Sequence, residues 1–114
     1  MIPSAMPAAA APEITRPAPD RVIAGDPVHT TWNSDEGGGL HVGQWQSTPG
    51  TWRVIYDEWE YFHIRQGHSI LTPDGGAPIH LRPGDALVIR SGTVGIWETV
   101  ETTLKDYVIR LDAP

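Results

Sequence analysis

Glycine and proline residues interrupt this chain so often that they limit it to short elements of secondary structure. The main interruptions are Pro49, Gly50, Gly67, Pro73, Gly75, Gly76, Pro78, Pro83, Gly84, Gly92 and Gly95. No segment free of both residue types shows ten positions of helical periodicity. The intervening segments are rich in β-branched and aromatic residues, and turn signals recur every 8–10 residues. This pattern predicts an all-β fold, an antiparallel sandwich or barrel with almost no helix.

The first 20 residues have a different composition. They contain five prolines, and no basic residue precedes Arg16. A secretory signal needs a positively charged start and an unbroken apolar stretch, so we do not expect one here. We predict a flexible Pro/Ala-rich tail over residues 1–20, a single domain over residues 21–114 and a cytoplasmic location.

The net charge of the chain limits the kinds of partner that this domain is expected to bind. The chain has 8 lysines and arginines against 14 aspartates and glutamates, a net charge of −6. Such a chain has no electrostatic attraction to phosphate backbones or anionic lipid, so we expect neither nucleic-acid nor membrane binding. The chain contains no stretch of ~18 apolar residues, which is the length needed to span a bilayer. The absence of cysteine excludes disulfides, thiolate nucleophiles and metal sites built on thiolates.

Alternation along two segments indicates which side chains point inward. The last segment carries one lysine and three apolar residues on the same face: Lys105, Tyr107, Ile109 and Leu111. We assign this face to the core. Between residues 58 and 65, Phe62 and Ile64 suit a core and share their phase with Glu60. Glu60 and Lys105 are therefore predicted to project into the interior. Trp59 and Tyr61, on the opposite face, are candidates for burial by a second subunit, which predicts a homodimer.

Two segments resemble the paired motifs of the cupin superfamily. The first is Glu60, six residues and Gly67, and the second is Pro83-Gly84-Asp85, six residues and Gly92. Further short motifs from Gly43 to Tyr107 follow the order seen in small single-domain cupins grouped with the ureidoglycine aminohydrolase cupin domain. The resemblance covers roughly residues 25–111. It implies a double-stranded β-helix, or jelly-roll, barrel, in which we expect both motif glycines to end strands at turns.

The resemblance also implies a metal site, and the sequence departs from it. Metal-dependent cupins supply an HxH pair shortly before the motif-one glutamate and another histidine in motif two. Residues 53–56 contain no histidine, and the motif-two position holds Gly95. Only Glu60 of the usual four ligands is present, and one carboxylate does not hold a transition metal selectively. We therefore expect no metal and no other cofactor.

The five histidines do not restore that site. They are His29, His41, His63, His68 and His80, which lie on separate segments or, for His63, on the opposite strand phase from Glu60. We expect them to be surface or partly buried residues. An unusual metal site made by Glu58, Glu60 and one distant histidine is the alternative.

A different set of residues is predicted to line the interior of the barrel. They are Tyr56, Glu58, Glu60, Trp97 and Lys105, together with Trp45 and Trp52. Lys105 is the only lysine of the chain, and a cation in a core phase is costly unless it is paired. Glu60 is its natural partner. Gly95 is expected to leave space for a small molecule where a ligand histidine would stand.

Two classes of function fit these residues. In the first, the barrel binds a small molecule, an amine, polyol or sugar-like compound, between the carboxylates and the aromatic side chains. In the second, the protein is a metal-independent enzyme of the isomerase, lyase or aminohydrolase type. Glu60 would then be the catalytic acid or base and Lys105 its partner or an electrophilic stabiliser. The sequence contains no nucleophile elbow, phosphate loop or nucleotide fingerprint.

Overall fold

The computed structural model describes residues 11–111, and this part of the chain is built almost entirely of strands. The elements in chain order are β1 (Glu13–Thr15), a 3-10 turn η1 (Pro19–Arg21), β2 (Val22–Gly25), β3 (His29–Gly37), β4 (Leu40–Ser47), β5 (Gly50–Ile55), β6 (Trp59–Pro73), β7 (Ile79–Leu81), β8 (Ala86–Ile89) and β9 (Val94–Arg110). The predicted all-β fold is confirmed.

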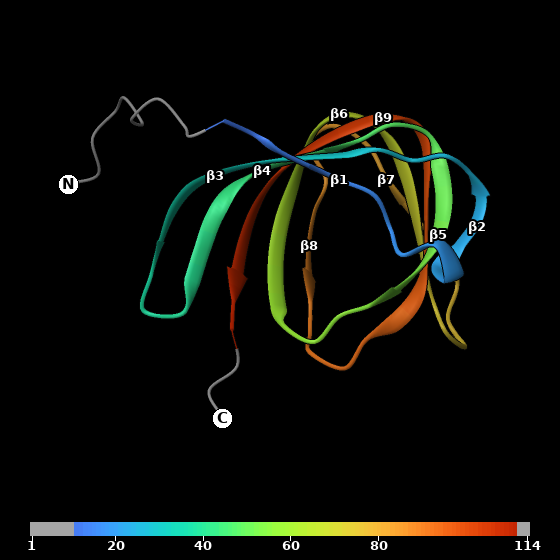
Figure 1. Cartoon of the computed structure of the whole chain (residues 1–114). Helices are drawn as coiled ribbons and strands as arrows, with labels where there is room; N and C mark the ends of the chain where they lie inside the picture. Colours follow the sequence, from blue (N-terminus) through green and yellow to red (C-terminus); the bar gives the residue numbers. More distant parts are fainter. Residues whose placement is uncertain (1–10, 112–114) are drawn as a thin grey trace.

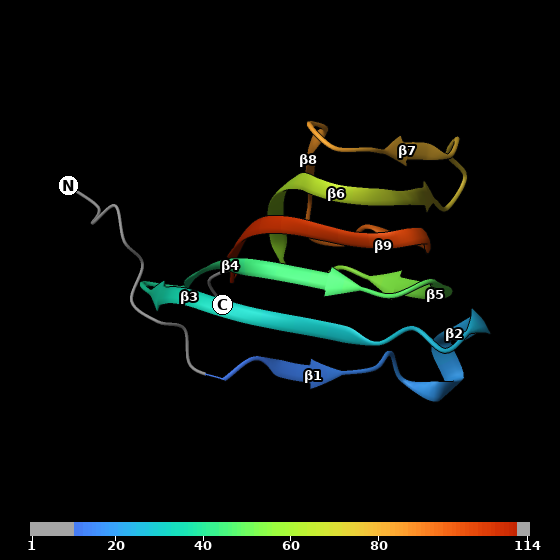
Figure 2. The same ribbon diagram turned by 90° about the horizontal axis from the view of Figure 1, so that it is seen from above.

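The strands form one antiparallel sheet that curls into a barrel (Figure 1). Along one path the order is β1-β3-β4-β9-β5-β2, and β6 pairs with β7, β8 and β9. Seen from above, the strands are stacked side by side with β9 between β4 and β6 (Figure 2). The long strands β6 and β9 therefore join the two halves of the barrel and carry most of the inward-facing side chains.

Gly67 occupies a different position from the one predicted. It lies inside β6, where the pairing with β9 shifts register several times between Ile64 and Ser69. Its φ is +89°, and a Cβ there would lie 2.1 Å from the carbonyl oxygen of Thr102. The prediction of a strand end at Gly67 is wrong, because a bulge lets one strand bend around the barrel without a turn. Gly92 does lie in a turn, with φ +92°.

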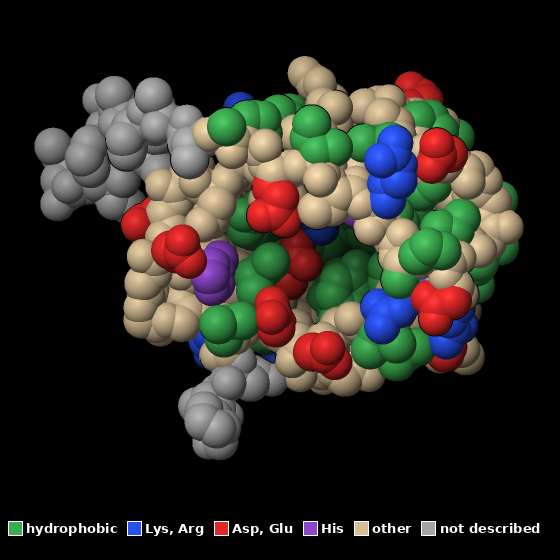
Figure 3. Space-filling model, viewed as in Figure 1, with side chains coloured by type: hydrophobic (Ala, Val, Ile, Leu, Met, Phe, Trp, Pro, Cys, Tyr) green, Lys and Arg blue, Asp and Glu red, His purple; other side chains and the backbone are tan. Residues whose placement is uncertain are grey.

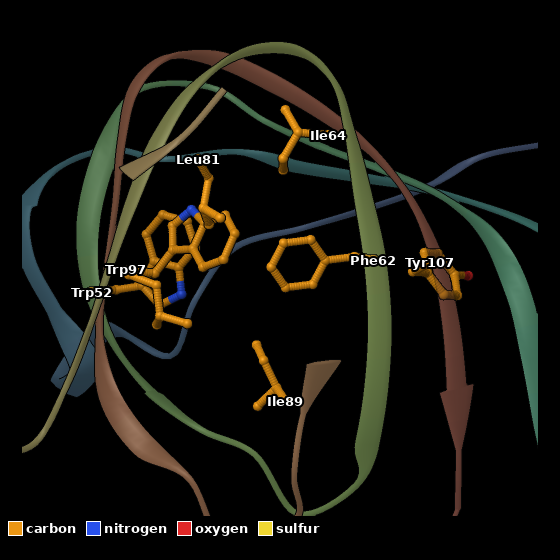
Figure 4. Packing of buried hydrophobic residues seen from close by; sticks show 8 residues of the cluster. Trp52, Phe62, Ile64, Leu81, Ile89, Trp97 and Tyr107 are labelled. Carbon is orange, nitrogen blue, oxygen red and sulfur yellow. The ribbon is translucent and has the colours of Figure 1, made fainter. Parts of the chain in front are cut away.

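The interior is filled by aromatic and aliphatic side chains from opposite walls. Figure 4 shows Trp52 and Trp97 facing Phe62, with Ile89 and Leu81 pointing into the same space. The predicted inward phase of β6 is confirmed by the burial of Glu60, Phe62 and Ile64, and that of β9 by Lys105 and Tyr107. Leu111 was assigned to this face but is 43% exposed, because β9 ends at Arg110.

The structure describes only residues 11–20 of the tail predicted over residues 1–20. In this part, Glu13–Thr15 form β1, which pairs with β3, and η1 follows before β2. Residues 1–10 lie outside the described residues. Within residues 11–111, no helix has the length and apolar character needed to cross a membrane.

Candidate functional site

The barrel encloses a cavity of about 270 Å³, here called the barrel cavity. Six of the predicted residues line it: Trp45, Trp52, Tyr56, Glu60, Trp97 and Lys105. A space-filling view shows the hollow, with a carboxylate and a cation at depth and further acidic side chains around its mouth (Figure 3). The alternation of β4, β5, β6 and β9 thus brings together residues up to 60 positions apart in sequence, from Trp45 to Lys105.

Glu60 and Lys105 form a buried ion pair in this cavity. Glu60 projects from β6 and Lys105 from β9, and the distance between Nζ and Oε2 is 2.8 Å. Only 7% of Glu60 and 6% of Lys105 is exposed. Removing two charges from water is costly, and their attraction offsets this only when the geometry is good. The pair leaves this part of the cavity without net charge.

The ammonium group of Lys105 also lies against three aromatic rings. Its Nζ is 4.6 Å from the ring centroid of Trp45, 4.5 Å from that of Phe62 and 5.0 Å from that of Trp97. Aromatic faces attract cations within about 6 Å, and more strongly when the cation is desolvated. The aromatic wall of the barrel cavity therefore stabilises an internal cation.

The three tryptophans belong both to the core and to the cavity wall. Trp52 and Trp97 are paired across β5 and β9, with ring centroids 6.4 Å apart. Trp45 meets Trp97 edge to face at 5.8 Å. The indole nitrogen of Trp97 donates a hydrogen bond of 3.1 Å to Oγ1 of Thr99. Because these rings are held by one another and by a buried hydroxyl, they present a rigid surface to the cavity.

Tyr56 follows β5 and lies near the ion pair. Its backbone N–H donates to the carbonyl of Thr93, and its own carbonyl accepts from the N–H of Gly92, so the turn before β9 holds it in place. Burial, and then the charge of Glu60, raise the pKa of the Tyr56 phenol above its usual range. The phenol therefore remains protonated and is available as a hydrogen-bond donor.

His29 is a cavity residue that the sequence reasoning missed. It projects from β3, and its ring centroid lies 4.6 Å from that of Trp52 and 5.0 Å from that of Trp45. Burial, and then the charge of Lys105, lower its pKa to about 4, so the imidazole is neutral near pH 7. Along β3, His29 and Thr31 point to the same face, and this alternation could have indicated that His29 points inward. Trp32 points to the opposite face, so the inward face of β3 is ambiguous from the sequence.

Glu58 and the other histidines lie outside the barrel cavity. Glu58 lines a neighbouring pocket of about 200 Å³ with Tyr56 and Glu60. Nδ1 of His41 is 3.3 Å from Glu36, that of His63 is 3.8 Å from Asp106, and His68 is hydrogen-bonded to His80 at 3.0 Å. Of the five histidines, all of which lie within residues 11–111, only His29 lines the barrel cavity.

The donor set of the barrel does not fit the metal that many cupins bind. Val54 and Tyr56 line the cavity where the histidine pair would stand, and Glu60 is engaged by Lys105. No group of three or more His, Asp or Glu side chains within residues 11–111 could hold a metal ion. Gly95 does not leave the predicted space, because a Cβ there would lie 2.5 Å from the carbonyl oxygen of Thr72 in the adjacent strand β6.

Comparisons with known proteins agree with this architecture. Residues 34–107 match the model of the EutQ-like cupin domain family. A solved structure from Pseudomonas syringae pv. tomato, a DUF861 protein of unknown function, is 22% identical, with a TM-score of 0.79 over 87% of this chain and 43% of that one. The EutQ protein of Clostridium difficile is 16% identical, with a TM-score of 0.67 over 74% of this chain and 63% of that one.

A third similar structure is a protein of unknown function from Rhizobium leguminosarum bv. viciae. It is 14% identical, with a TM-score of 0.66 over 74% of this chain and 82% of that chain. This chain thus spans about two fifths of the Pseudomonas protein and under two thirds of the Clostridium protein. A search among curated proteins finds no match. These likenesses establish the jelly-roll fold.

Proposed function

The chain belongs to the EutQ-like cupin domain family, and we propose that its barrel binds a small uncharged molecule rich in hydroxyl groups, a polyol or a sugar-like compound, without a metal. The observation that carries this proposal is the ion pair between Glu60 and Lys105 inside a cavity walled by tryptophans. The pair supplies hydrogen-bonding groups of both kinds and no net charge.

The position of Lys105 favours an uncharged ligand over an amine. A cationic ligand would need a carboxylate and free aromatic faces. Lys105 already uses Glu60 together with the faces of Trp45 and Trp97, and its charge would repel a second cation. An anion would meet the carboxylate of Glu60 in the same place. A hydroxylated molecule can donate to Oε1 of Glu60, since Lys105 engages Oε2, and lie with its C–H face against the indole of Trp52.

The volume of the cavity limits the size of the ligand. At about 270 Å³ it lies just below the range of roughly 300–1,000 Å³ found for small-molecule sites. Its wall combines indole rings with a few convergent polar groups, as is common in such sites. Tyr56 adds a protonated phenol. We expect a ligand no larger than a monosaccharide or a cyclic polyol.

Saturation-transfer NMR on the untagged protein tests this proposal with a matched series of probes. D-glucose and myo-inositol represent the uncharged class, glucosamine the cations and glucuronate the anions. We expect transfer to at least one uncharged probe at millimolar concentration and at least tenfold weaker binding of both charged probes. Stronger binding of glucosamine would contradict the charge argument, and binding of none of the four would contradict the proposed class.

The enzyme hypothesis remains the second candidate, and one observation favours it. A carboxylate, an ammonium group and a protonated phenol line the same open cavity, an arrangement that suits acid–base catalysis. The binding function is preferred because it needs only the hydrogen-bonding groups and the indole wall that line the cavity, and no proton transfer. Conversion of a bound probe, abolished by Glu60→Gln, would support the enzyme.

Within the family, we propose a close relation to the ureidoglycine aminohydrolase cupins. The ordered short motifs from Gly43 to Tyr107 support it. We also propose a cytoplasmic location; the absence of cysteine from the 114 residues fits a reducing compartment.

A further inference from the structure

We propose that His29 is the residue through which the barrel cavity recognises a ligand hydroxyl group. This inference deepens the proposed function and rests on it. Neither the strand motifs nor the family's metal positions include His29, which reaches the cavity from β3.

The first observation is an unpartnered polar atom. Within residues 11–111, Nε2 of His29 is the one buried side-chain nitrogen or oxygen without a hydrogen-bond partner. A buried polar group left unsatisfied is destabilising, and native structures rarely retain one without a reason. The ring lines the barrel cavity, so a small movement of the imidazole on ligand binding would let a molecule there supply the missing partner.

The second observation is the fixed orientation of the ring. His29 packs at 4.6 Å against Trp52 and at 5.0 Å against Trp45, measured between ring centroids. These two indoles hold the imidazole at an angle of about 50° to each ring plane. A side chain held on two sides is preorganised, so it loses little conformational entropy when a ligand binds.

A neutral imidazole suits a hydroxyl group in either of its tautomers. Nε2 carries a proton in one tautomer and a lone pair in the other, and a hydroxyl can serve either because it both donates and accepts. An ammonium group matches only one tautomer and would be repelled by Lys105, and a carboxylate matches only the other and would be repelled by Glu60. Lys105 and His29 both lie within about 5 Å of the ring of Trp45, so one small molecule can contact the imidazole and the ion pair together.

Two variants test this role with the same uncharged probes, D-glucose and myo-inositol. His29→Phe keeps a flat ring between the two indoles but removes both nitrogens. His29→Gln places an amide near the position of Nε2 and retains hydrogen bonding. We expect His29→Phe to weaken binding of the better probe about tenfold or more, as loss of one buried hydrogen bond predicts, and His29→Gln to remain within about threefold of wild type.

The outcomes separate this inference from the function on which it rests. If wild type binds a probe and His29→Phe binds it equally well, the role of His29 is overturned while the proposed function stands. If wild type binds neither probe, both proposals are overturned. Thermal melting of each variant identifies a folding defect. If His29→Phe does not fold, His29→Leu takes its place: binding weakened about tenfold or more in a folded His29→Leu, with His29→Gln near wild type, supports the role, and unchanged binding by a folded His29→Leu overturns it.

Discussion

Lys105 is the single residue on which the chemistry of the cavity most depends. A lysine inside a barrel of this size would be destabilising if it were alone. Here Glu60 accepts its hydrogen bond at 2.8 Å, and three aromatic rings surround its ammonium group. Each partner makes the burial of the other tolerable, so the two residues should behave as a unit in mutational experiments.

A double-mutant cycle measures this coupling. Lys105→Met or Glu60→Gln alone should lower the free energy of unfolding by about 3–5 kcal/mol, because each leaves a buried charge or polar group without its partner. The double variant should recover part of that loss. Chemical denaturation of the four proteins gives the coupling energy. Single variants that unfold like wild type would mean that the pair is solvated in solution.

His29 predicts a pH dependence of stability. Its pKa in the folded protein is about 4, below the value of 6.5 expected in the unfolded chain. Between these values the unfolded state binds more protons, so stability should fall as the pH drops from 6.5 to 4. The full shift corresponds to about 3 kcal/mol, and we expect about half, because solvent reaches part of the ring and screens the charge.

The control for this prediction is His29→Gln, which has no titrating group at position 29. Lys105, Glu60 and Tyr56 face the same cavity and are unchanged in the variant. The difference in unfolding free energy between the two proteins, measured from pH 7 to pH 4, isolates the contribution of His29. A constant difference over this range would refute the prediction.

The sequence predicted the ion pair but not His29, for a physical reason. On β6 and β9, Glu60 and Lys105 share their phase with unmistakable core residues such as Phe62 and Tyr107. On β3 both phases carry aromatic side chains, so alternation does not say which face is inside. An inward-facing histidine on such a strand can be identified only from the three-dimensional structure.

The strands β6 and β9 bend together around the barrel near the Gly67 bulge, and hydrogen bonds between their side chains stabilise this bend. At this point Ser69 Oγ lies 2.7 Å from Thr103 Oγ1 and 3.4 Å from Thr99 Oγ1, all three residues being buried. Thr99 in turn accepts the hydrogen bond from Trp97. The bend therefore links the strand bulge to the indole wall of the cavity through a buried chain of hydroxyl groups.

Substitution at the bulge should be severe. Gly67→Ala places a Cβ 2.1 Å from the carbonyl oxygen of Thr102, at a φ that side chains rarely adopt. We expect a loss of more than about 3 kcal/mol in unfolding free energy. Gly37→Ala is the matched control, because a Cβ there meets nothing within 4 Å; it should change stability by less than about 0.5 kcal/mol. Equal melting of both variants would contradict the role of the bulge.

The same bend explains why the strand end predicted from the sequence at Gly67 is wrong. A glycine between two β-rich segments indicates a turn in most sheets. Gly67 instead lets one strand continue from one half of the barrel into the other, and only its contact with Thr102 distinguishes the two cases. The strand content was predictable from local pattern, whereas the fusion of segments into β6 depends on contacts distant in sequence.

At the scale of the whole molecule, the outer face carries an apolar row across four strands. Val42, Val108, Tyr61 and Val88 are paired in register from β4 through β9 and β6 to β8. Tyr61 is 38% exposed and Val88 44%. Trp59, the other residue predicted to meet a second subunit, is partly covered by the guanidinium of Arg110, 5.3 Å from its ring. We propose that this row is the interface of a homodimer.

Sedimentation velocity at micromolar concentration tests the dimer. Wild type should sediment as a dimer, and Tyr61→Asp should sediment as a monomer because a charge at the centre of the row would be desolvated on association. Ile23→Asp, an exposed residue on β2, is the control and should leave the dimer intact. A monomeric wild-type protein would rule out the proposed interface at these concentrations.

Native mass spectrometry tests whether this barrel holds an ion pair in place of a metal ion. Untagged protein would be incubated with Zn²⁺, Mn²⁺ or Ni²⁺, exchanged into volatile buffer and weighed, with His80→Ala as a control for the surface pair of His68 and His80. We predict that the chain carries no stoichiometric ion. One ion per chain that survives in His80→Ala and disappears in the Glu60→Gln/Lys105→Met double variant would show that the barrel cavity binds a metal.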